Sequence, residues 1–420
     1  MFWENLVDKF IIEGGVKLKG EVVVSGSKNA ALPIMAASLL ADSPVTLDNI
    51  PKLRDIHTMT KMLEHLGAEV DRHDHTARIQ PTLTTHEAPY ELVKTMRASI
   101  YVMGPLLAKR GHVRCALPGG CVIGQRPINL HLKGFEALGA RVTVSHGFVE
   151  ATAKKLKGAE IHMDVVSVGA TANVMMGAVL AEGATVIRPA AKEPHIVDLG
   201  RFLNAMGARV EGLGTDCLTI QGVRKLKGVE YSIISDYIEA GTLMAAGAIT
   251  QGRITIVNAP HLDIEHVVGK LREAGVPIVM KSGKIQEGVP KRLKSVDVTT
   301  APHPGFPTDM QAQWMALMSV AEGTSMITET IWENRFMHAS ELGRMGAEIG
   351  IEGHVAVVKG VTQLTGAPVM VSDLRAGAAL VLAGLAARGR TEVHRVYHLD
   401  RGYEGLEVKL AMLGARIKRV

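Results

Sequence analysis

The sequence predicts an α/β protein made of six copies of one αβ unit, arranged as two similar domains of three copies each. Three observations carry this prediction: a recurring helix end, a recurring join between a helix and a strand, and the length of the chain. A chain of 420 residues exceeds the usual size of a single hydrophobic core, so two domains are favoured over one.

The helix end has the pattern apolar-Gly-Ala/Val and occurs six times, at intervals of 68 to 72 residues. Its glycines are Gly67, Gly139, Gly207, Gly275, Gly346 and Gly414. A glycine here suits the left-handed conformation that ends a helix, and the alternating residues after it suit a strand. These intervals exceed the roughly 20 to 50 residues typical of solenoid repeats.

The second join is an Ala/Leu-rich helix that meets a strand at a glycine, as at Gly183, Gly252 and Gly323. Hydrophobic residues make up 47% of the chain and aromatic residues only 4%, with 44 glycines. This composition favours tight packing of helices and strands on small aliphatic side chains.

The segment from Leu117 to Pro127 predicts a functional thiol. Residues 112–117 have the pattern of a strand and residues 128–138 that of a helix, so Cys121 falls in a glycine-rich connection. A nearby helix N-terminus and Arg126 would both stabilise a thiolate. Cys115 and Cys217 lie in apolar or strand-like runs, which are typical of small buried hydrophobes.

The charge pattern indicates a small anionic substrate. The net charge is +5, but no block of like charges and few aromatic residues are present, which argues against a nucleic-acid partner. Three unpaired cysteines predict neither a disulfide framework nor a zinc site. The first residues lack a signal-peptide pattern, and the weakly charged run 376–387 is too short to span a bilayer, so we expect a cytoplasmic protein without membrane insertion.

Lys28 is a candidate anion ligand. A strand-like run, residues 21–24, leads through Ser25-Gly26-Ser27 into an Ala/Leu-rich helix that continues to residue 40. Amide groups at that helix start could hold an anion together with Lys28. Taken alone, Ser25-Gly26-Ser27 favours an ordinary turn and N-cap over an anion site.

Asp309 follows a Pro/Gly-rich loop, residues 303–307, and could be either a helix cap or a catalytic carboxylate. Arg375 and Arg401 each follow an aspartate closely, so they could form structural ion pairs. Arg97 lies on a helix-like segment and could simply be solvated.

Taken together, these motifs resemble the UDP-N-acetylglucosamine 1-carboxyvinyltransferase family over essentially the whole chain. The motifs that carry the resemblance are Gly26-Ser27-Lys28-Asn29, Pro118-Gly119-Gly120-Cys121 through Arg126-Pro127, Ser167-Val168-Gly169, Pro307-Thr308-Asp309-Met310, Glu333-Asn334-Arg335, Asp373-Leu374-Arg375 and Asp400-Arg401-Gly402-Tyr403. The resemblance implies two domains of three βαβαββ units each, with the helices packed inward as an inside-out barrel. It places the first domain at residues 28–234 and the second at residues 1–27 plus 235–420, with the active site in the cleft between them.

The implied activity is transfer of the enolpyruvyl group of phosphoenolpyruvate to UDP-N-acetylglucosamine, the first committed step of peptidoglycan synthesis, without a cofactor or metal. Cys121 would be the proton donor, form an adduct with phosphoenolpyruvate and be the fosfomycin target. Asp309 would be the base, and Lys28, Arg126 and Arg401 would hold phosphoenolpyruvate. The family pattern assigns the nucleotide sugar, or the cleft beside it, to Asn29, Arg97, Arg126, Pro127, Ile128, Asn129, Leu130, Ser167, Val168, Gly169, Asp309, Ile331, Arg335, Asp373 and Arg375.

Two positions depart from the family pattern. Tyr101 stands where a Trp is often found, and Val165 stands where some members place a Lys. Two other interpretations stay open: a 5-enolpyruvylshikimate-3-phosphate synthase, which shares the fold but is not built around a Pro-Gly-Gly-Cys loop, and a regulatory paralogue that binds the nucleotide sugar without turnover.

Overall fold

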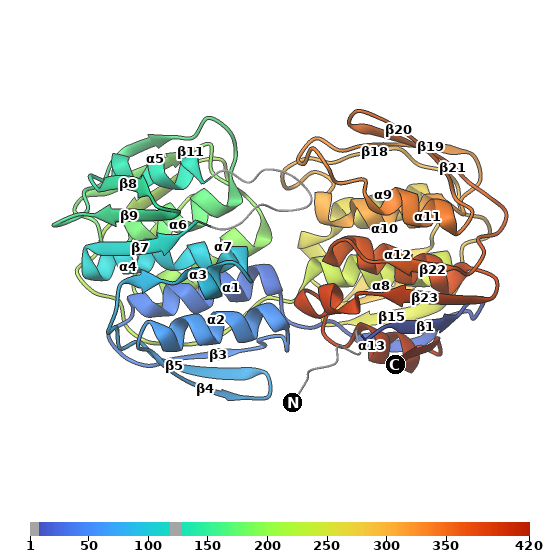
Figure 1. Cartoon of the computed structure of the whole chain (residues 1–420), viewed down its shortest axis with the longest axis horizontal. Coiled ribbons are helices and arrows are strands. Elements are labelled where there is room, and N and C mark those ends of the chain that lie inside the picture. The colour runs from blue at the N-terminus through green and yellow to red at the C-terminus, as the bar shows by residue number, and fades with distance from the viewer. Residues whose placement is uncertain (1–7, 118–127) are drawn as a thin grey trace. The chain divides into compact units, whose positions relative to one another are not determined.

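The computed structural model describes residues 8–117 and 128–420, which form two compact units (Figure 1). The 26–234 unit comprises residues 26–117 and 128–234. The 235–420 unit comprises residues 8–25 and 235–420. Within the described residues the chain passes from one unit to the other after Ser25 and returns after Ile234, so the first unit is inserted into the second.

The described part of the 26–234 unit contains three four-stranded sheets, with strand orders β14-β3-β5-β4, β6-β7-β9-β8 and β10-β11-β13-β12. Their strands are β3 (Val45–Asp48), β4 (Glu69–His73), β5 (Thr76–Gln80), β6 (Glu87–Ala88), β7 (His112–Ala116), β8 (Arg141–Ser145), β9 (Phe148–Thr152), β10 (Glu160–His162), β11 (Ala184–Arg188), β12 (Arg209–Glu211), β13 (Leu218–Gln221) and β14 (Glu230–Ser232).

The 235–420 unit also has three four-stranded sheets in its described part, with orders β16-β17-β15-β2, β18-β19-β21-β20 and β22-β23-β1-β24. Their strands are β1 (Phe10–Glu13), β2 (Lys19–Val23), β15 (Arg253–Val257), β16 (Ile278–Lys281), β17 (Lys284–Glu287), β18 (Val298–Thr299), β19 (Thr324–Thr328), β20 (Glu348–Glu352), β21 (Val355–Lys359), β22 (Pro368–Met370), β23 (Arg390–His394) and β24 (Arg416–Arg419).

All six sheets share one pairing pattern. Each has one parallel pair at an edge, such as β10 with β11, and the remaining neighbours are antiparallel. Strand β1 pairs with both β23 and β24, and β2 pairs with β15, so strands from the start of the chain complete sheets in the 235–420 unit. The repeated pattern confirms six copies of one αβ unit.

The most deeply buried helices lie inside the sheets of each unit, whereas others, such as α13 (Leu406–Met412), keep an exposed face. In the 235–420 unit α8, α10 and α12 run side by side, with sheets outside them (Figure 1), and nearly every residue of α1, α6, α8, α10 and α12 is buried. The expected inward packing is therefore confirmed. The helices are α1 (Lys28–Ala37), α2 (Arg54–His65), α3 (Tyr90–Val93), α4 (Met103–Arg110), α5 (Asn129–Ala137), α6 (Val168–Ala178), α7 (Pro194–Ala205), α8 (Tyr237–Ile249), α9 (Glu265–Glu273), α10 (Gln311–Met318), α11 (His338–Arg344), α12 (Leu374–Ala386) and α13 (Leu406–Met412), with 3₁₀ turns η1 (Ser38–Leu40), η2 (Arg97–Val102), η3 (His261–Asp263), η4 (Thr308–Met310) and η5 (Val396–Arg401).

The six repeat glycines all have left-handed backbone conformations, with φ between +89° and +105°. Each lies between a helix and the edge strand that follows it, as Gly139 does between α5 and β8. The expectation that these glycines end helices is confirmed, and it explains why no residue with a Cβ replaces them.

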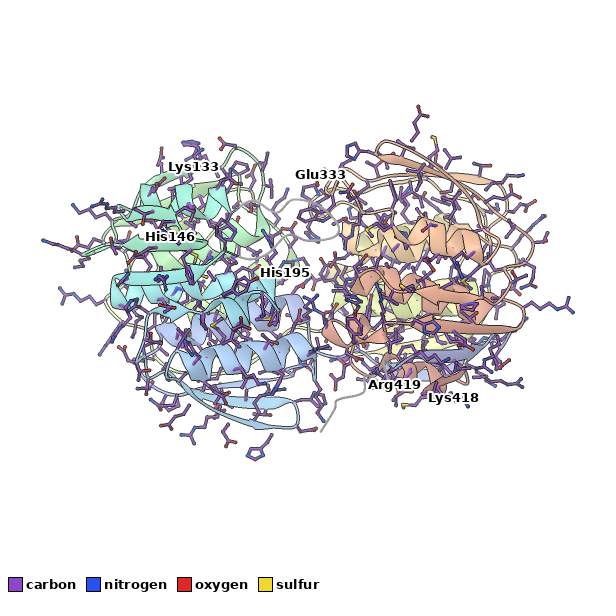
Figure 2. All side chains as sticks on the ribbon, in the orientation of Figure 1. Lys133, His146, His195, Glu333, Lys418 and Arg419 are labelled. Atoms are coloured by element: carbon purple, nitrogen blue, oxygen red, sulfur yellow. The ribbon has the colours of Figure 1, made fainter. Side chains whose placement is uncertain are left out.

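Polar side chains cover the outer surfaces of the units. Figure 2 labels Lys133, His146 and Lys418 among them, and all three are exposed. Buried polar groups include Lys28, Arg335 and Arg375, which are candidate site residues.

Candidate active site

In the 235–420 unit, Asp309 lies between two buried arginines. Nη2 of Arg335 donates to Oδ1 of Asp309 at 2.7 Å, and Nη2 of Arg375 donates to Oδ2 at 2.9 Å. Arg335 is 5% exposed and Arg375 2%, whereas the Asp309 side chain keeps 28% exposure. The carboxylate is therefore paired on both oxygens and still open to a third group.

These arginines determine the protonation state of Asp309. Burial alone would raise the pKa of the carboxyl group, but the charges and hydrogen bonds of Arg375 and Arg335 lower this pKa well below its usual range. Asp309 is therefore ionised at neutral pH and accepts hydrogen bonds.

Asp373 holds the helix that carries Arg375. Its side chain is the N-cap of α12 and accepts hydrogen bonds from the backbone N–H groups of Arg375 and Ala376, at 2.9 and 3.1 Å. The guanidinium of Arg375 pairs with Asp309 instead of with Asp373. The cap explains this choice, because it directs the Asp373 carboxylate at the helix end.

Tyr403 supports Arg375 from a different segment. The guanidinium lies 5.2 Å from the centroid of the Tyr403 ring, within cation–π range. The Tyr403 hydroxyl accepts from Nε2 of Gln313 at 3.0 Å and lies 3.0 Å from Oγ1 of Thr242. Arg401 is half-buried at the end of η5, two residues before Tyr403.

The loop after β19 carries Ile331. The backbone N–H groups of Ile331 and Trp332 donate to Oε1 of Glu329, at 2.8 and 3.2 Å. The Glu329 side chain is completely buried. Sequence reasoning missed this glutamate, because no pattern in the chain sets it apart from a solvated one.

In the 26–234 unit, Lys28 is the first residue of α1. Its Nζ lies 2.9 Å from Oδ2 of Asp55, a buried aspartate of α2. Ser27 is the N-cap of α1 and accepts from the backbone N–H of Ala30 at 3.4 Å. The N-cap interpretation is thus confirmed, and the half-buried Asn29 follows Lys28 in the same first turn.

A second helix start in this unit carries the predicted Ser-Val-Gly segment. Ser167 is the N-cap of α6, and its hydroxyl accepts from the backbone N–H of Ala170 at 3.3 Å. Gly169 lies in the first turn, where a Cβ would come within 3.0 Å of Nε2 of His131. The free N–H groups of such a first turn are suited to an anion.

His131 supports that helix start from α5. Nδ2 of Asn173 lies 3.0 Å from Nδ1 of His131, and Oδ1 of Asn173 accepts from the backbone N–H of Gly104 at 2.8 Å. Because Asn173 is the donor, Nδ1 of His131 is the acceptor and the ring proton is on Nε2, which faces Gly169. Burial, followed by the charge of Arg97, lowers the pKa of His131 to about 4.

The remaining expected contacts flank these helix starts. Arg97 is the first residue of η2 and is half-buried. Ile128 precedes α5, Asn129 is exposed at its first position, and Leu130 is buried. The structure thus brings Asp309, Arg335 and Arg375 into direct contact within one unit, with Lys28, Ser167 and Gly169 at two helix starts of the other.

Cys121, Arg126 and Pro127 lie outside the described residues. Of the other two cysteines, Cys115 is buried in β7, and burial raises the pKa of its thiol to about 12, which confirms its interpretation as a small hydrophobe. Cys217 is half-buried.

Within residues 8–117 and 128–420, no three His, Cys, Asp or Glu side chains are grouped so as to hold a metal ion. Among the helices of the same residues, none combines the length and the apolar character that a membrane crossing requires.

Comparison with known proteins places this arrangement in a family. The family model described as EPSP synthase (3-phosphoshikimate 1-carboxyvinyltransferase) matches residues 12–410. A UDP-N-acetylglucosamine 1-carboxyvinyltransferase of Trichlorobacter lovleyi is 58% identical over 99% of both chains. The chain belongs to the UDP-N-acetylglucosamine 1-carboxyvinyltransferase family. A further relative, UDP-N-acetylglucosamine 1-carboxyvinyltransferase 1 of Caldanaerobacter subterraneus subsp. tengcongensis, is 55% identical over 98% of this chain and 99% of its own.

Solved structures of enolpyruvyl transferases share the fold of this chain. The enolpyruvyl transferase NikO from Streptomyces tendae has a TM-score of 0.89 at 27% identity, covering 98% of this chain and 99% of its own. An EPSP synthase from Acinetobacter baumannii has a TM-score of 0.78 at 18% identity, covering 98% of this chain and 100% of its own, which shows a shared fold alone. The expected enolpyruvyl transferase fold is confirmed.

Proposed function

We propose that this chain transfers the enolpyruvyl group of phosphoenolpyruvate to the 3′-hydroxyl of UDP-N-acetylglucosamine, with release of phosphate. The observation that carries this proposal is the identity of 55 to 58% with relatives of that name over nearly the whole chain. The doubly paired Asp309 supports it, because the reaction needs an ionised carboxylate beside a substrate hydroxyl.

The reaction proceeds by addition and elimination. In the addition, the 3′-oxygen bonds to C2 of phosphoenolpyruvate, the hydroxyl loses its proton and a proton joins C3. In the elimination, C3 loses a proton, the bond from C2 to the phosphate oxygen breaks and phosphate leaves. Both steps need positioned proton donors and acceptors, and cations to hold the anionic groups.

Asp309 acts as the hydrogen-bond acceptor and base for the hydroxyl. Its lowered pKa makes it a weak base in the resting site, because Arg335 and Arg375 oppose protonation. Asp309 therefore orients the hydroxyl first. It takes the proton only as the new C–O bond forms and makes the hydroxyl acidic.

Cationic side chains and a thiol contact phosphoenolpyruvate. Lys28, Arg126 and Arg401 hold its phosphate and carboxylate, and Cys121 delivers the proton to C3 and can form a covalent adduct. The first turn of α6 supports binding of the diphosphate, because Ser167, Val168 and Gly169 present backbone N–H groups at a helix start. The other proposed contacts of the nucleotide sugar are Asn29, Arg97, Pro127, Ile128, Asn129, Leu130, Ile331, Arg335, Asp373 and Arg375.

Phosphate release by the purified full-length chain tests the proposal. We expect release that requires both phosphoenolpyruvate and UDP-N-acetylglucosamine and is absent with shikimate 3-phosphate. Release with shikimate 3-phosphate instead would favour the related synthase. Tight binding of the nucleotide sugar without any release would favour a regulatory paralogue.

Two variants separate the proposed roles. Cys121→Ala is expected to lose turnover and fosfomycin sensitivity together, and fosfomycin should alkylate the unmodified chain at Cys121. Asp309→Ala is expected to lose about 10²- to 10⁴-fold in kcat, the range typical of a positioned base, while it still binds the nucleotide sugar. Wild-type turnover in a folded Asp309→Ala variant would remove Asp309 from this role. A cytoplasmic role in peptidoglycan synthesis would follow from the activity.

A further inference from the structure

Glu329 connects three separate segments of the 235–420 unit. It follows β19, and its buried carboxyl group accepts four hydrogen bonds. Oε1 accepts from Thr300 Oγ1 at 2.9 Å and from the backbone N–H groups of Ile331 and Trp332 at 2.8 and 3.2 Å. Oε2 accepts from Thr308 Oγ1 at 2.8 Å. The two backbone N–H groups can only donate, so Oε1 is necessarily an acceptor.

The hydroxyl of Thr308 connects Glu329 to the arginine beside Asp309. Thr308 has one hydroxyl proton and donates it to Glu329, so its lone pairs are free to accept from Nη1 of Arg335, at 2.7 Å. Nη2 of the same guanidinium donates to Asp309. The orientation of Arg335, and through it that of Asp309, therefore depends on Glu329.

The charges along this path alternate. Glu329 is followed by Arg335, Asp309 and Arg375, and Asp236 adds a further acidic group that acts on Arg375. A neutral residue at position 329 would remove one of the acidic groups from this path and so change the surroundings of Arg335 and Asp309.

Equivalent positions in two other repeats show that the sheet itself does not need a glutamate. Asn49 follows β3 and Asn258 follows β15, as Glu329 follows β19. Their amides donate to backbone carbonyls of Ile233 and Val24, which lie just beyond the parallel neighbours of those strands. A short amide therefore suffices to close the sheet, and the longer, charged side chain at 329 reaches the segments that carry Asp309 and Ile331.

We propose that Glu329 is a positioning residue of the transfer reaction, which fixes the Asp309–Arg335 pair through Thr308 and fixes the Ile331–Trp332 backbone directly. The proposal rests on the function proposed above, since it assigns Asp309 and Ile331 to the nucleotide sugar. Glu329 acts through these groups and does not itself touch the substrate.

Steady-state kinetics of Glu329→Gln test the proposal, with Glu287→Gln as the matched control. Glu287 is the same residue type and is buried in the same unit, but among the described residues neither of its carboxyl oxygens has a hydrogen-bond partner. We expect Glu329→Gln to lose about 10²-fold in kcat/KM for UDP-N-acetylglucosamine, the scale of a misplaced reacting group. Its KM for phosphoenolpyruvate should change less than twofold, and Glu287→Gln should match the wild type in both constants.

Substitutions of Thr308 separate the two effects of Glu329, the one on Arg335 and Asp309 and the one on the backbone of Ile331 and Trp332. Thr308→Val removes the hydroxyl link but leaves the bonds of Glu329 to Ile331 and Trp332, so it should lower kcat more than it raises the KM for the nucleotide sugar. Thr308→Ser, which keeps the hydroxyl, should recover most of the lost kcat. A folded Glu329→Gln variant with wild-type kcat and KM values would overturn the proposal.

Hydrogen exchange gives a readout that does not need activity. The amides of Ile331 and Trp332 should exchange faster in Glu329→Gln than in the wild type, and at wild-type rates in Glu287→Gln and Thr308→Val. An inactive wild-type chain would contradict the proposed function while this exchange experiment still tested the positioning role. Unchanged exchange of both amides in Glu329→Gln would refute that role.

Discussion

Arg375 donates twice to the same oxygen of Asp309, from Nε at 3.2 Å and from Nη2 at 2.9 Å, although the two residues are 66 positions apart. Arg335 occupies the other oxygen. Two guanidinium groups thus form ion pairs with one carboxylate. The planar guanidinium of an arginine makes the direction of these hydrogen bonds specific, which the ammonium group of a lysine cannot do.

The pH dependence of turnover should show how far the two arginines lower the pKa of Asp309. In the proposed reaction Asp309 must be ionised to accept from the sugar hydroxyl. Its lowered pKa should keep the wild type free of an acidic limb from Asp309 above about pH 4, near the ordinary aspartate value. Arg375→Gln removes one of the two charges that lower this pKa, so the acidic limb of kcat should move to higher pH. A pH–rate profile checks this, with Tyr403→Phe as a control that keeps both charges. An Arg375→Gln variant with a lower kcat but an unmoved acidic limb would contradict the charge argument.

Replacing Glu287 should stabilise the protein. Burial raises the pKa of this carboxyl group well above its usual value, and neither oxygen has a hydrogen-bond partner within the described residues. The corresponding strand positions in other repeats are apolar, such as Ile79 and Val358. Glu287→Leu should therefore gain about 1–3 kcal/mol near pH 4, where the carboxyl group is largely protonated in both states, because this is the cost of burying an unpaired polar group.

The sign of the pH effect distinguishes Glu287 from a simple packing change. The folded state keeps the proton that the unfolded state loses above about pH 4.3, so wild-type stability falls by about 1.4 kcal/mol per pH unit from there until the raised pKa is reached. The advantage of Glu287→Leu in denaturant titrations should accordingly grow from pH 5 to pH 8. A constant advantage across this range would argue against a proton held on Glu287.

His131 should give a pH effect of the opposite sign. Its pKa is lowered to about 4 by burial and by Arg97, so between about pH 6.5 and 4 only the unfolded state takes up the proton. Wild-type stability therefore falls as the pH falls through this window, and the neutral substitution His131→Gln should lack that contribution. Melting temperatures of both proteins from pH 7 to pH 4.5 check this.

In the proposed site, the same substitution, His131→Gln, should also weaken binding of the nucleotide sugar. His131 places its Nε2 proton toward Gly169 in the first turn of α6, so His131→Gln should raise the KM for UDP-N-acetylglucosamine more than the KM for phosphoenolpyruvate. Equal changes in both KM values would indicate a general loss of structure instead.

Alanine substitutions at Gly134, inside α5, and at Gly139, just after α5, should destabilise the protein for different reasons. Gly139 has φ +89° with no atom within 4 Å of a built Cβ, so Gly139→Ala should cost about 1–2 kcal/mol of backbone strain. A Cβ at Gly134 would lie 2.2 Å from Cγ2 of Val174, so Gly134→Ala should cost about 1–3 kcal/mol by overpacking. Val174→Ala should relieve Gly134→Ala and leave Gly139→Ala unchanged in thermal denaturation.

The sequence predicted the repeated parts of this fold because their signals are local. Each glycine such as Gly139 lies within a few residues of the helix it ends, and the strand pattern of residues 112–117 matches β7. Asp309 and Arg375 were identified as candidates, but their contact was not, since nothing local links residues 66 positions apart. Ser27 was interpretable as a cap because a cap spans only three residues.

The residues that sequence reasoning missed depend on burial. Glu329 and Asp55 look like solvated carboxylates in the sequence, and only the folded chain shows them completely or almost completely buried. His131 likewise adjoins a predicted segment, but its role comes from Asn173, 42 residues away on α6. Patterns of apolar residues show which faces of helices and strands are buried. They do not show which polar side chains are buried together with those faces.

The pairing of β1 with β23 and β24 has a consequence for synthesis. At about 5 to 20 residues per second, roughly 20 to 80 s separate the translation of Phe10 from that of its last partner, Arg419. The described residues of the inserted 26–234 unit are all synthesised long before the end of the chain, whereas β1 has neither of its partner strands until β23 and β24 have been made. Ribosome-bound intermediates should therefore expose an apolar strand, Phe10-Ile11-Ile12, and be natural clients for a holding chaperone.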